Sequence, residues 1–231
     1  MKQSKFIVIE GLDGSGKSTQ LELLQSYLEE KGVIFRHVHF PRLGQGVYGT
    51  LVADFLRGAF GKLEEVHPKL VALLYAGDRK DFAETIAHWL AEGILVIADR
   101  YVYSNIAFQC AKCIEPREKE ELKQWILDLE YGYYKIPKPD FSLFLDVSIV
   151  SAAKALSEDD ERTTRDYLNG SQDIHESDLD FQERVHQEYL NLTRSEEDIH
   201  RLLCVDKHGQ RLSPDYTHRA IIRKLQEMNI L

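Results

Sequence analysis

Short runs of β-branched, aliphatic and aromatic residues recur along the chain, separated by longer segments of helical character. Four of these runs predict strands at residues 5–9, 33–40, 94–98 and 141–147, and a weaker one predicts a fifth strand at 200–205. The run at 94–98 is apolar throughout, which is typical of a strand buried on both faces of a parallel sheet. The pattern therefore favours a layered structure over a bundle of helices.

The segments between the predicted strands carry helical periodicity. A helix is expected from Lys17 to Gly32, and residues 51–89 and 103–131 are mostly helical in pattern. Strands that alternate with helices predict βαβ units, and thus an α/β fold with a five-stranded parallel sheet flanked by helices in three layers. Because the chain has neither an internal repeat nor a linker-like stretch, we expect one domain over residues 1–231.

Composition and charge exclude several classes of protein. The 231 residues are 43% hydrophobic, and 29 Lys and Arg against 38 Asp and Glu give a formal charge of −9. Such a chain can bury a core, and it lacks the basic surface that a nucleic-acid polymer requires. Its apolar runs are too short for a membrane span, its start does not resemble a signal peptide, and three cysteines suit a reducing compartment. We therefore expect a cytoplasmic protein.

One segment differs from the rest in its charge. Residues 157–180 hold nine acidic and two basic side chains and few aliphatic ones, and account for seven of the nine net negative charges. A stretch that buries so little apolar area is expected to be an exposed excursion from the core. Its two basic residues are Arg162 and Arg165.

A phosphate-binding motif follows the first predicted strand and opens the first predicted helix. It matches GxxxxGK(S/T) and consists of Gly11, Leu12, Asp13, Gly14, Ser15, Gly16, Lys17, Ser18 and Thr19. The glycines allow backbone N–H groups and a helix N-terminus to face anionic phosphates. Lys17 is expected to reach the β- and γ-phosphates, and the Ser18 hydroxyl is expected to bind Mg²⁺. The motif predicts a site for ATP.

A second acidic position ends the apolar run at 94–98. Asp99 is the carboxylate expected to hold Mg²⁺ and its waters, and Arg100 follows it at the sheet edge where α/β folds bind ligands. A guanine-specific switch protein would carry an NKxD segment, which this sequence lacks, and an ATP-driven motor is normally longer. The sequence therefore favours a small phosphotransferase.

The order of further motifs resembles the thymidylate kinase family. After the phosphate loop come Phe40-Pro41-Arg42, residues 75–79 (YAGDR), residues 99–101 (DRY) with the Ser-Asn and AFQ groups that follow, and a Pro-Lys-Pro-Asp turn at 137–140. The resemblance covers roughly residues 5–190. It implies a P-loop kinase fold that transfers the γ-phosphoryl group of ATP to dTMP with Mg²⁺, and it implies a homodimer built from segments 51–90 and 103–131.

The resemblance also implies roles for individual residues. Asp13 would bind the 3′-hydroxyl of dTMP near the acceptor phosphate, which Arg42 and Arg100 would hold. Tyr75 would stack on thymine, and Phe108 would exclude a 2′-hydroxyl. The polar edge of the base would be read by Arg79 and Asn105, and the remaining expected members of the acceptor site are Phe40, Ser104 and Gln109.

In this family the excursion at about 157–180 would be a lid that closes over the nucleotides. Relatives without a basic residue at the position of Ser15 carry their catalytic arginine in the lid, which makes Arg162 the first candidate and Arg165 the second. Residues 173–176 align with a segment that more often reads Asp-Arg-Tyr-Glu. Here it contains His175 and Glu176, so the usual arginine and tyrosine have no matching side chain.

Two other functions remain open at this stage. The chain could phosphorylate another nucleoside monophosphate or a deoxynucleoside, or it could bind ATP as a regulatory protein without efficient turnover. The pair Cys110 and Cys113 is a lone CxxC in a helical stretch, which favours a structural role over a zinc site.

Overall fold

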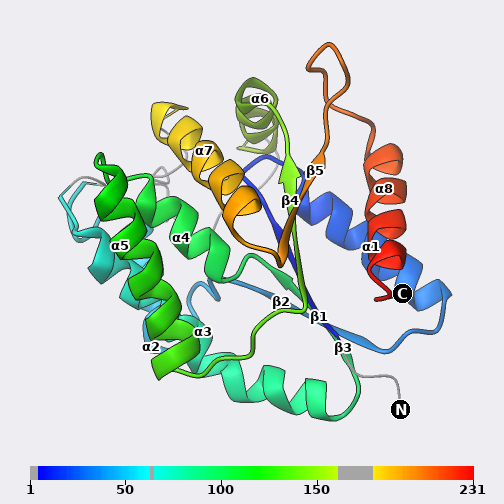
Figure 1. Cartoon of the computed structure of the whole chain (residues 1–231), viewed down its shortest axis with the longest axis horizontal. Coiled ribbons are helices and arrows are strands. Elements are labelled where there is room, and N and C mark those ends of the chain that lie inside the picture. The colour runs from blue at the N-terminus through cyan, green and yellow to red at the C-terminus, as the bar shows by residue number, and fades with distance from the viewer. Residues whose placement is uncertain (1–4, 63–64, 161–178) are drawn as a thin grey trace.

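The computed structural model of the chain describes residues 5–62, 65–160 and 179–231 (Figure 1). Five strands form one parallel sheet in the order β2-β3-β1-β4-β5. Their bounds are β1 Phe6–Glu10, β2 Phe35–His39, β3 Leu95–Asp99, β4 Phe141–Asp146 and β5 Ile199–Leu203. Every residue of β1, β3 and β4 is buried, as the continuous apolar runs predict.

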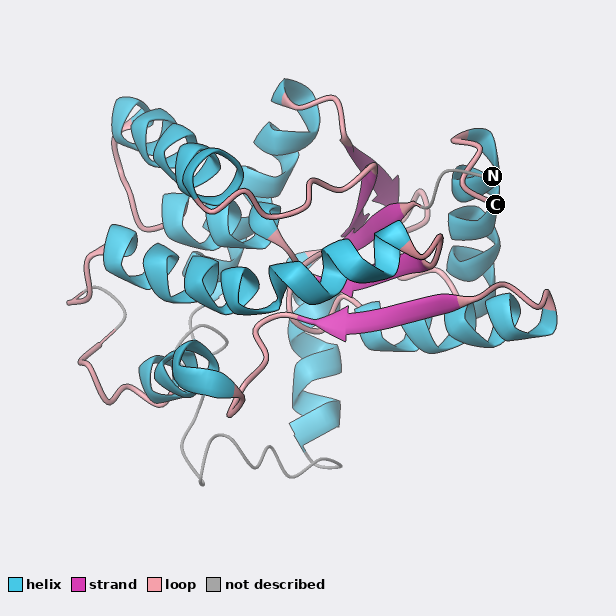
Figure 2. Cartoon of the chain, turned by 90° about the horizontal axis from the view of Figure 1, so that it is seen from below, coloured by secondary structure: helices cyan, strands magenta, loops and turns pink. Residues whose placement is uncertain are grey.

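Helices cover both faces of this sheet (Figures 1 and 2). They are α1 Lys17–Glu30, α2 Gly46–Leu56, α3 Pro68–Ala91, α4 Val102–Cys110, α5 Pro116–Leu127, α6 Ile149–Asp160, α7 Leu179–Ser195 and α8 Pro214–Glu227, with a π-helical turn, η1, at Asp128–Tyr133. Side chains of β1 alternate between the two faces. Ile7 and Ile9 pack toward α1 and α8, whereas Phe6 and Val8 pack toward α2, α3, α4 and α7. The three-layer α/β fold expected from the sequence is confirmed.

The two long helical segments are each divided in the structure. Residues 57–67 separate α2 from α3, which begins with Pro68 and is capped by the His67 ring, a hydrogen-bond acceptor for the Lys69 N–H. A break at residues 111–115 separates α4 from α5, which begins with Pro116. Proline fits the first turn of a helix because its missing N–H needs no partner there. These prolines set helix starts that the apolar periodicity does not resolve.

The central strands bring two distant segments of sequence together. β1 pairs with β3 in parallel, with Ile9 opposite Asp99, and the Arg100 N–H donates to the Ile9 carbonyl at 2.9 Å. The phosphate loop after β1 therefore lies beside the turn after β3 at the carboxyl edge of the sheet. Within the part of the chain that the structure describes, no helix is both long enough and apolar enough to cross a lipid bilayer.

Candidate active site

The loop between β1 and α1 has the backbone that its glycines predict. Gly14 has a φ of 72° and Gly16 a φ of 90°, both in the left-handed region that side chains disfavour. A Cβ on Gly14 would also lie 2.2 Å from the Ala152 carbonyl oxygen. Gly16 directly precedes α1, so the loop ends at the helix N-terminus, where backbone N–H groups favour an anion.

Lys17 is held inside this loop. Its side chain is buried, and Nζ donates to the Leu12 carbonyl at 2.8 Å and to the Gly11 carbonyl at 3.3 Å. Burial, together with the positive charge of Arg100, lowers the pKa of Lys17 to about 8, although Asp13, Asp99 and Glu10 act in the opposite direction. The amine is thus poised for an anionic partner that would stabilise its charge.

Arg100 crosses from the end of β3 to the phosphate loop. Its φ of 63° is unusual for a residue with a side chain, and its Nη2 lies 2.5 Å from Asp13 Oδ1. Nη1 donates to Ser104 Oγ at 3.2 Å, and the guanidinium lies 5.1 Å from the centre of the Phe108 ring. Burial lowers the pKa of Arg100, but Asp13 and the other acidic groups outweigh burial and raise it above its ordinary value. Arg100 is therefore a fixed cation.

Glu10 holds the residues that follow Arg100 in place, and this role was not predicted from the sequence. It is fully buried at the end of β1, where it accepts hydrogen bonds from the Tyr101 N–H at 3.0 Å, from Ser104 Oγ at 2.5 Å and from the Tyr189 hydroxyl at 3.0 Å. Burial raises the pKa of its carboxyl group. The network fixes the start of α4, which carries Ser104 and Asn105.

Asp99 and Ser18 supply side-chain oxygen atoms beside the phosphate loop. Asp99 is buried and its Oδ2 lies 3.0 Å from His39 Nδ1, whereas Oδ1 has no hydrogen-bond partner within the described residues. Burial raises the pKa of Asp99, but the His39 hydrogen bond and the Lys17 charge outweigh it and lower the pKa overall. The Ser18 side chain is exposed. A carboxylate and a hydroxyl beside a phosphate loop fit Mg²⁺, which takes few protein ligands besides phosphates and water.

Two clefts meet at this edge of the sheet. The first has about 640 Å³ of space and the second about 1710 Å³. Residues 13–19 and Asp99 line the second cleft, as expected for an ATP site, whereas Gly11 and Leu12 do not. The clefts share Asp13, His39 and Arg100. A phosphoryl donor bound in one cleft and a phosphoryl acceptor bound in the other would thus meet beside the fixed cation Arg100.

The first cleft contains almost all of the residues that the sequence predicts for the acceptor. These are Asp13, Phe40, Tyr75, Arg79, Arg100, Ser104, Asn105, Phe108 and Gln109. Gln109 is buried, and neither atom of its amide has a hydrogen-bond partner among the described residues. An unpaired buried amide in a cleft wall is costly unless a ligand binds it, so Gln109 is a strong candidate contact.

Arg42 is the predicted acceptor residue that does not line this cleft. Its Nη2 lies 2.9 Å from Asp78 Oδ1, its backbone N–H donates to Asp78 Oδ2 at 2.8 Å, and its guanidinium lies over the Phe82 ring. Its neighbours Pro41 and Leu43 do line the cleft. Arg42 therefore lies next to the cleft with its charge paired to α3.

Arg211 is a further residue of the second cleft that the sequence did not single out. It belongs to the loop between β5 and α8, and its Nη1 donates to the Gly14 carbonyl at 3.1 Å. The signal was weak because an arginine after an uncertain strand has no local motif around it. Arg162, Arg165, His175 and Glu176 lie outside the described residues.

Comparisons with known proteins bear on the family and the fold of the chain. A family model described as thymidylate kinase matches residues 9–207. A probable thymidylate kinase from Methanococcus aeolicus is 30% identical over 99% of both chains, and a thymidylate kinase from Clavibacter sepedonicus is 35% identical over 87% of this chain and 86% of its own length. A solved thymidylate kinase structure from Candida albicans shares the fold, with a TM-score of 0.71 and 24% identity over 99% of this chain and 93% of that one.

Most of the motifs that carried the resemblance in the sequence contribute residues to the two clefts, whereas the Pro-Lys-Pro-Asp turn lines neither of them. The matching family model spans all of these motifs. The chain belongs to the thymidylate kinase family.

Proposed function

We propose that the chain phosphorylates dTMP to dTDP with ATP as the phosphoryl donor. The observation that supports this most is the meeting of two clefts at Asp13 and Arg100, with the phosphate loop in one and the predicted acceptor residues in the other. Direct transfer needs the two substrates in line and the developing negative charge stabilised. Relatives named thymidylate kinase support the choice of acceptor.

In the donor cleft, residues 13–19 would bind the phosphates of ATP, and Gly11 and Leu12 would support the loop from outside the cleft. Lys17 would contact the β- and γ-phosphates once it leaves the loop carbonyls that it now binds. Ser18 and Asp99 would hold Mg²⁺, which neutralises phosphate charge. Arg211 would bind the nucleotide from its place beside the loop, where it already contacts the Gly14 carbonyl.

In the acceptor cleft, Arg100 would hold the phosphate of dTMP, with Arg42 joining it after exchanging Asp78 for the phosphate. Asp13 would bind the 3′-hydroxyl, Tyr75 would stack on thymine and Phe108 would leave no room for a 2′-hydroxyl. Arg79 and Asn105 would read the base, and Phe40, Ser104 and Gln109 would complete the walls of the cleft.

An acceptor panel tests the proposal. ADP release is measured with Mg-ATP and one of dTMP, dUMP, UMP, dCMP, AMP, GMP or thymidine. We expect kcat/KM for dTMP to exceed that for every other acceptor. A preference for another acceptor would keep the kinase activity and contradict thymine reading by Arg79 and Asn105. ATP binding without ADP release across the whole panel would instead indicate a regulatory nucleotide-binding protein.

We expect the affinity for ATP to fall as the pH rises above about 8, because the Lys17 amine loses its proton there. The phosphates of ATP raise the pKa of Lys17, so binding at about pH 9 should take up a proton, whereas at pH 7 the amine is already charged. Calorimetry in buffers of different ionisation enthalpy measures this uptake. Binding heats that do not depend on the buffer at either pH would contradict a role for Lys17 in binding phosphate.

We also propose a homodimer, a single domain with a lid at about 157–180, and a cytoplasmic location. Phe60, Leu70 and Ile114 are exposed apolar side chains on the two segments expected to form the interface. The free cysteines Cys110, Cys113 and Cys204 suit a reducing compartment. Sedimentation velocity measures the assembly directly, and a single species at the monomer mass would contradict the dimer.

A further inference from the structure

The π-helical turn η1 places a buried carboxylate behind the wall of the acceptor cleft. Glu130 has none of its surface exposed. Its Oε2 accepts from Arg79 Nε at 2.5 Å, and its Oε1 accepts from Arg79 Nη2 at 2.7 Å and from Asn105 Nδ2 at 3.0 Å. One side chain thus binds both residues that are expected to read the base, one from α3 and one from α4.

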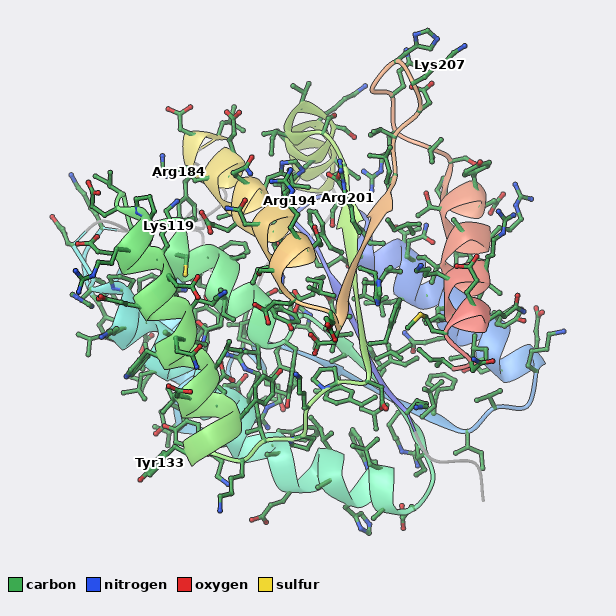
Figure 3. The ribbon with its side chains drawn as sticks, viewed as in Figure 1. Lys119, Tyr133, Arg184, Arg194, Arg201 and Lys207 are labelled. Carbon is green, nitrogen blue, oxygen red and sulfur yellow. The ribbon has the colours of Figure 1, made fainter. Side chains whose placement is uncertain are left out.

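The turn itself directs Glu130 inward. Tyr133, three residues later, lies at the outer end of this segment with 79% of its surface exposed (Figure 3). The Glu130 carbonyl accepts from the Ile136 N–H at 3.1 Å and so fixes the backbone. π-Helical turns are uncommon and often occur at functional sites, so the Glu130 side chain that η1 buries is a candidate for a functional role.

The contacts of Asn105 determine which way its amide faces. Nδ2 donates to Glu130 Oε1 and, at 3.1 Å, to the Ala72 carbonyl. Both partners can only accept hydrogen bonds, so the amide nitrogen must face them and Oδ1 must face away. Oδ1 is buried without a hydrogen-bond partner in the described part of the chain, and Asn105 lines the cleft. Asn105 therefore presents an acceptor to a ligand.

Arg79 is fixed in the same way. Glu130 accepts hydrogen bonds from its Nε and Nη2 as a bidentate partner, which leaves Nη1 outside that pair. Only 2% of Arg79 is exposed, and the residue lines the cleft. A buried guanidinium requires a counter-charge, and the bidentate geometry also sets the plane of the group. Arg79 therefore presents a donor beside the Asn105 acceptor.

We propose that Glu130 is a positioning residue that sets the base specificity of the acceptor cleft, holding Asn105 as an acceptor and Arg79 as a donor. This pair of groups matches a pyrimidine with an imino N3–H and a C4 carbonyl, as in thymine. Cytosine presents the opposite pattern, an N3 acceptor and an exocyclic amino donor. The inference rests on the proposed function, in which this cleft binds dTMP.

A glutamine at position 130 cannot replace the carboxylate. If its oxygen takes the place of Oε1, its NH₂ faces Arg79 Nε, which is also a donor. If the amide is reversed, the NH₂ faces Arg79 Nη2 and Asn105 Nδ2, two further donors. Either orientation places donor against donor, so the Asn105 amide is released to rotate and Arg79 loses its counter-charge.

The test is the Glu130→Gln variant, with kcat and KM measured separately for dTMP and dCMP. We expect the ratio of kcat/KM for dTMP over dCMP to fall about tenfold or more, mainly through a higher KM for dTMP, because buried polar groups left mispaired dominate such discrimination. The KM for ATP should stay within about twofold, because the donor cleft does not contain Glu130. Glu121→Gln is the matched control, since Glu121 is exposed and forms an ion pair with Arg117 at the surface of α5.

A second variant covers the case in which Glu130→Gln does not fold. Glu130→Asp keeps a carboxylate as the counter-charge of Arg79, but its side chain is one methylene shorter and cannot reach both Arg79 and Asn105. This variant should show the same fall in the ratio of kcat/KM for dTMP over dCMP. An unchanged ratio in a folded variant would overturn the positioning role of Glu130 and leave the proposed function standing. Wild-type protein that prefers dCMP would contradict the proposed acceptor as well.

Discussion

Replacing Lys17 by alanine should abolish turnover, with kcat reduced by on the order of 10³ or more, because phosphoryl transfer depends on positioning and charge stabilisation. Lys17 is the cation at the start of α1, a buried residue that lines the donor cleft with its Nζ 2.8 Å from the Leu12 carbonyl. Direct transfer forms no covalent enzyme intermediate, so the reaction has no alternative route that avoids the need for the Lys17 charge. The fixed cation Arg100 lies at the junction with the acceptor cleft and is already paired with Asp13 at 2.5 Å, so its charge does not replace that of Lys17.

The fold should survive this substitution. Because the pKa of Lys17 in the folded chain is lowered to about 8, the unfolded chain binds that proton more tightly, so the charge opposes folding at neutral pH. Thermal unfolding at pH 7 should therefore show no large loss of stability, and Lys31→Ala, at the exposed end of α1, serves as the control for activity. A folded Lys17→Ala protein with near-normal kcat would refute the assignment of the phosphate loop.

The sequence was most informative where local chemistry and burial agree. The apolar run before Asp99 predicted a central strand because only a strand covered on both faces tolerates such a run, and β3 occupies Leu95–Asp99. The glycines of the phosphate loop predicted a loop whose backbone N–H groups face phosphates, and Gly14 and Gly16 have the positive φ angles that allow such a turn. The parallel pairing of β1 and β3 then explains why motifs about ninety residues apart share one site.

The supporting residues were not predictable in the same way. Glu130 lies in a helical segment with no recognisable motif around it, and its role depends on α3 and α4 being packed against η1. Glu10 reads as the polar end of a strand, although it holds Ser104 and Tyr189 from distant parts of the chain. Burial of a charged group depends on tertiary contacts that no local pattern records.

The charged residues at the junction of the clefts do not fully account for how the transferring phosphoryl group is stabilised. Asp13 already neutralises much of the Arg100 charge, and the Lys17 amine is held by loop carbonyls in the donor cleft. Ser15 contributes no charge within the loop. A transferring phosphoryl group spreads negative charge over three oxygens, and an additional arginine is the usual means of stabilising it. Among the described residues, Arg211 lies beside the phosphate loop. Arg162 and Arg165, which lie outside the described residues, are the candidates that the sequence favours.

Arg162→Ala should therefore lower kcat by on the order of 10³, while the KM for dTMP changes little, because an arginine finger acts on the transition state. Arg165→Ala and Arg211→Ala are the matched variants. Arg211 donates to the Gly14 carbonyl beside the phosphate loop, so its loss should mainly raise the KM for ATP. Single-turnover transfer from ATP to dTMP separates the chemical step from binding. A large loss only in Arg165→Ala would identify that residue as the finger, and a large loss only in Arg211→Ala would place the function in the loop before α8, since that guanidinium already contacts the phosphate loop.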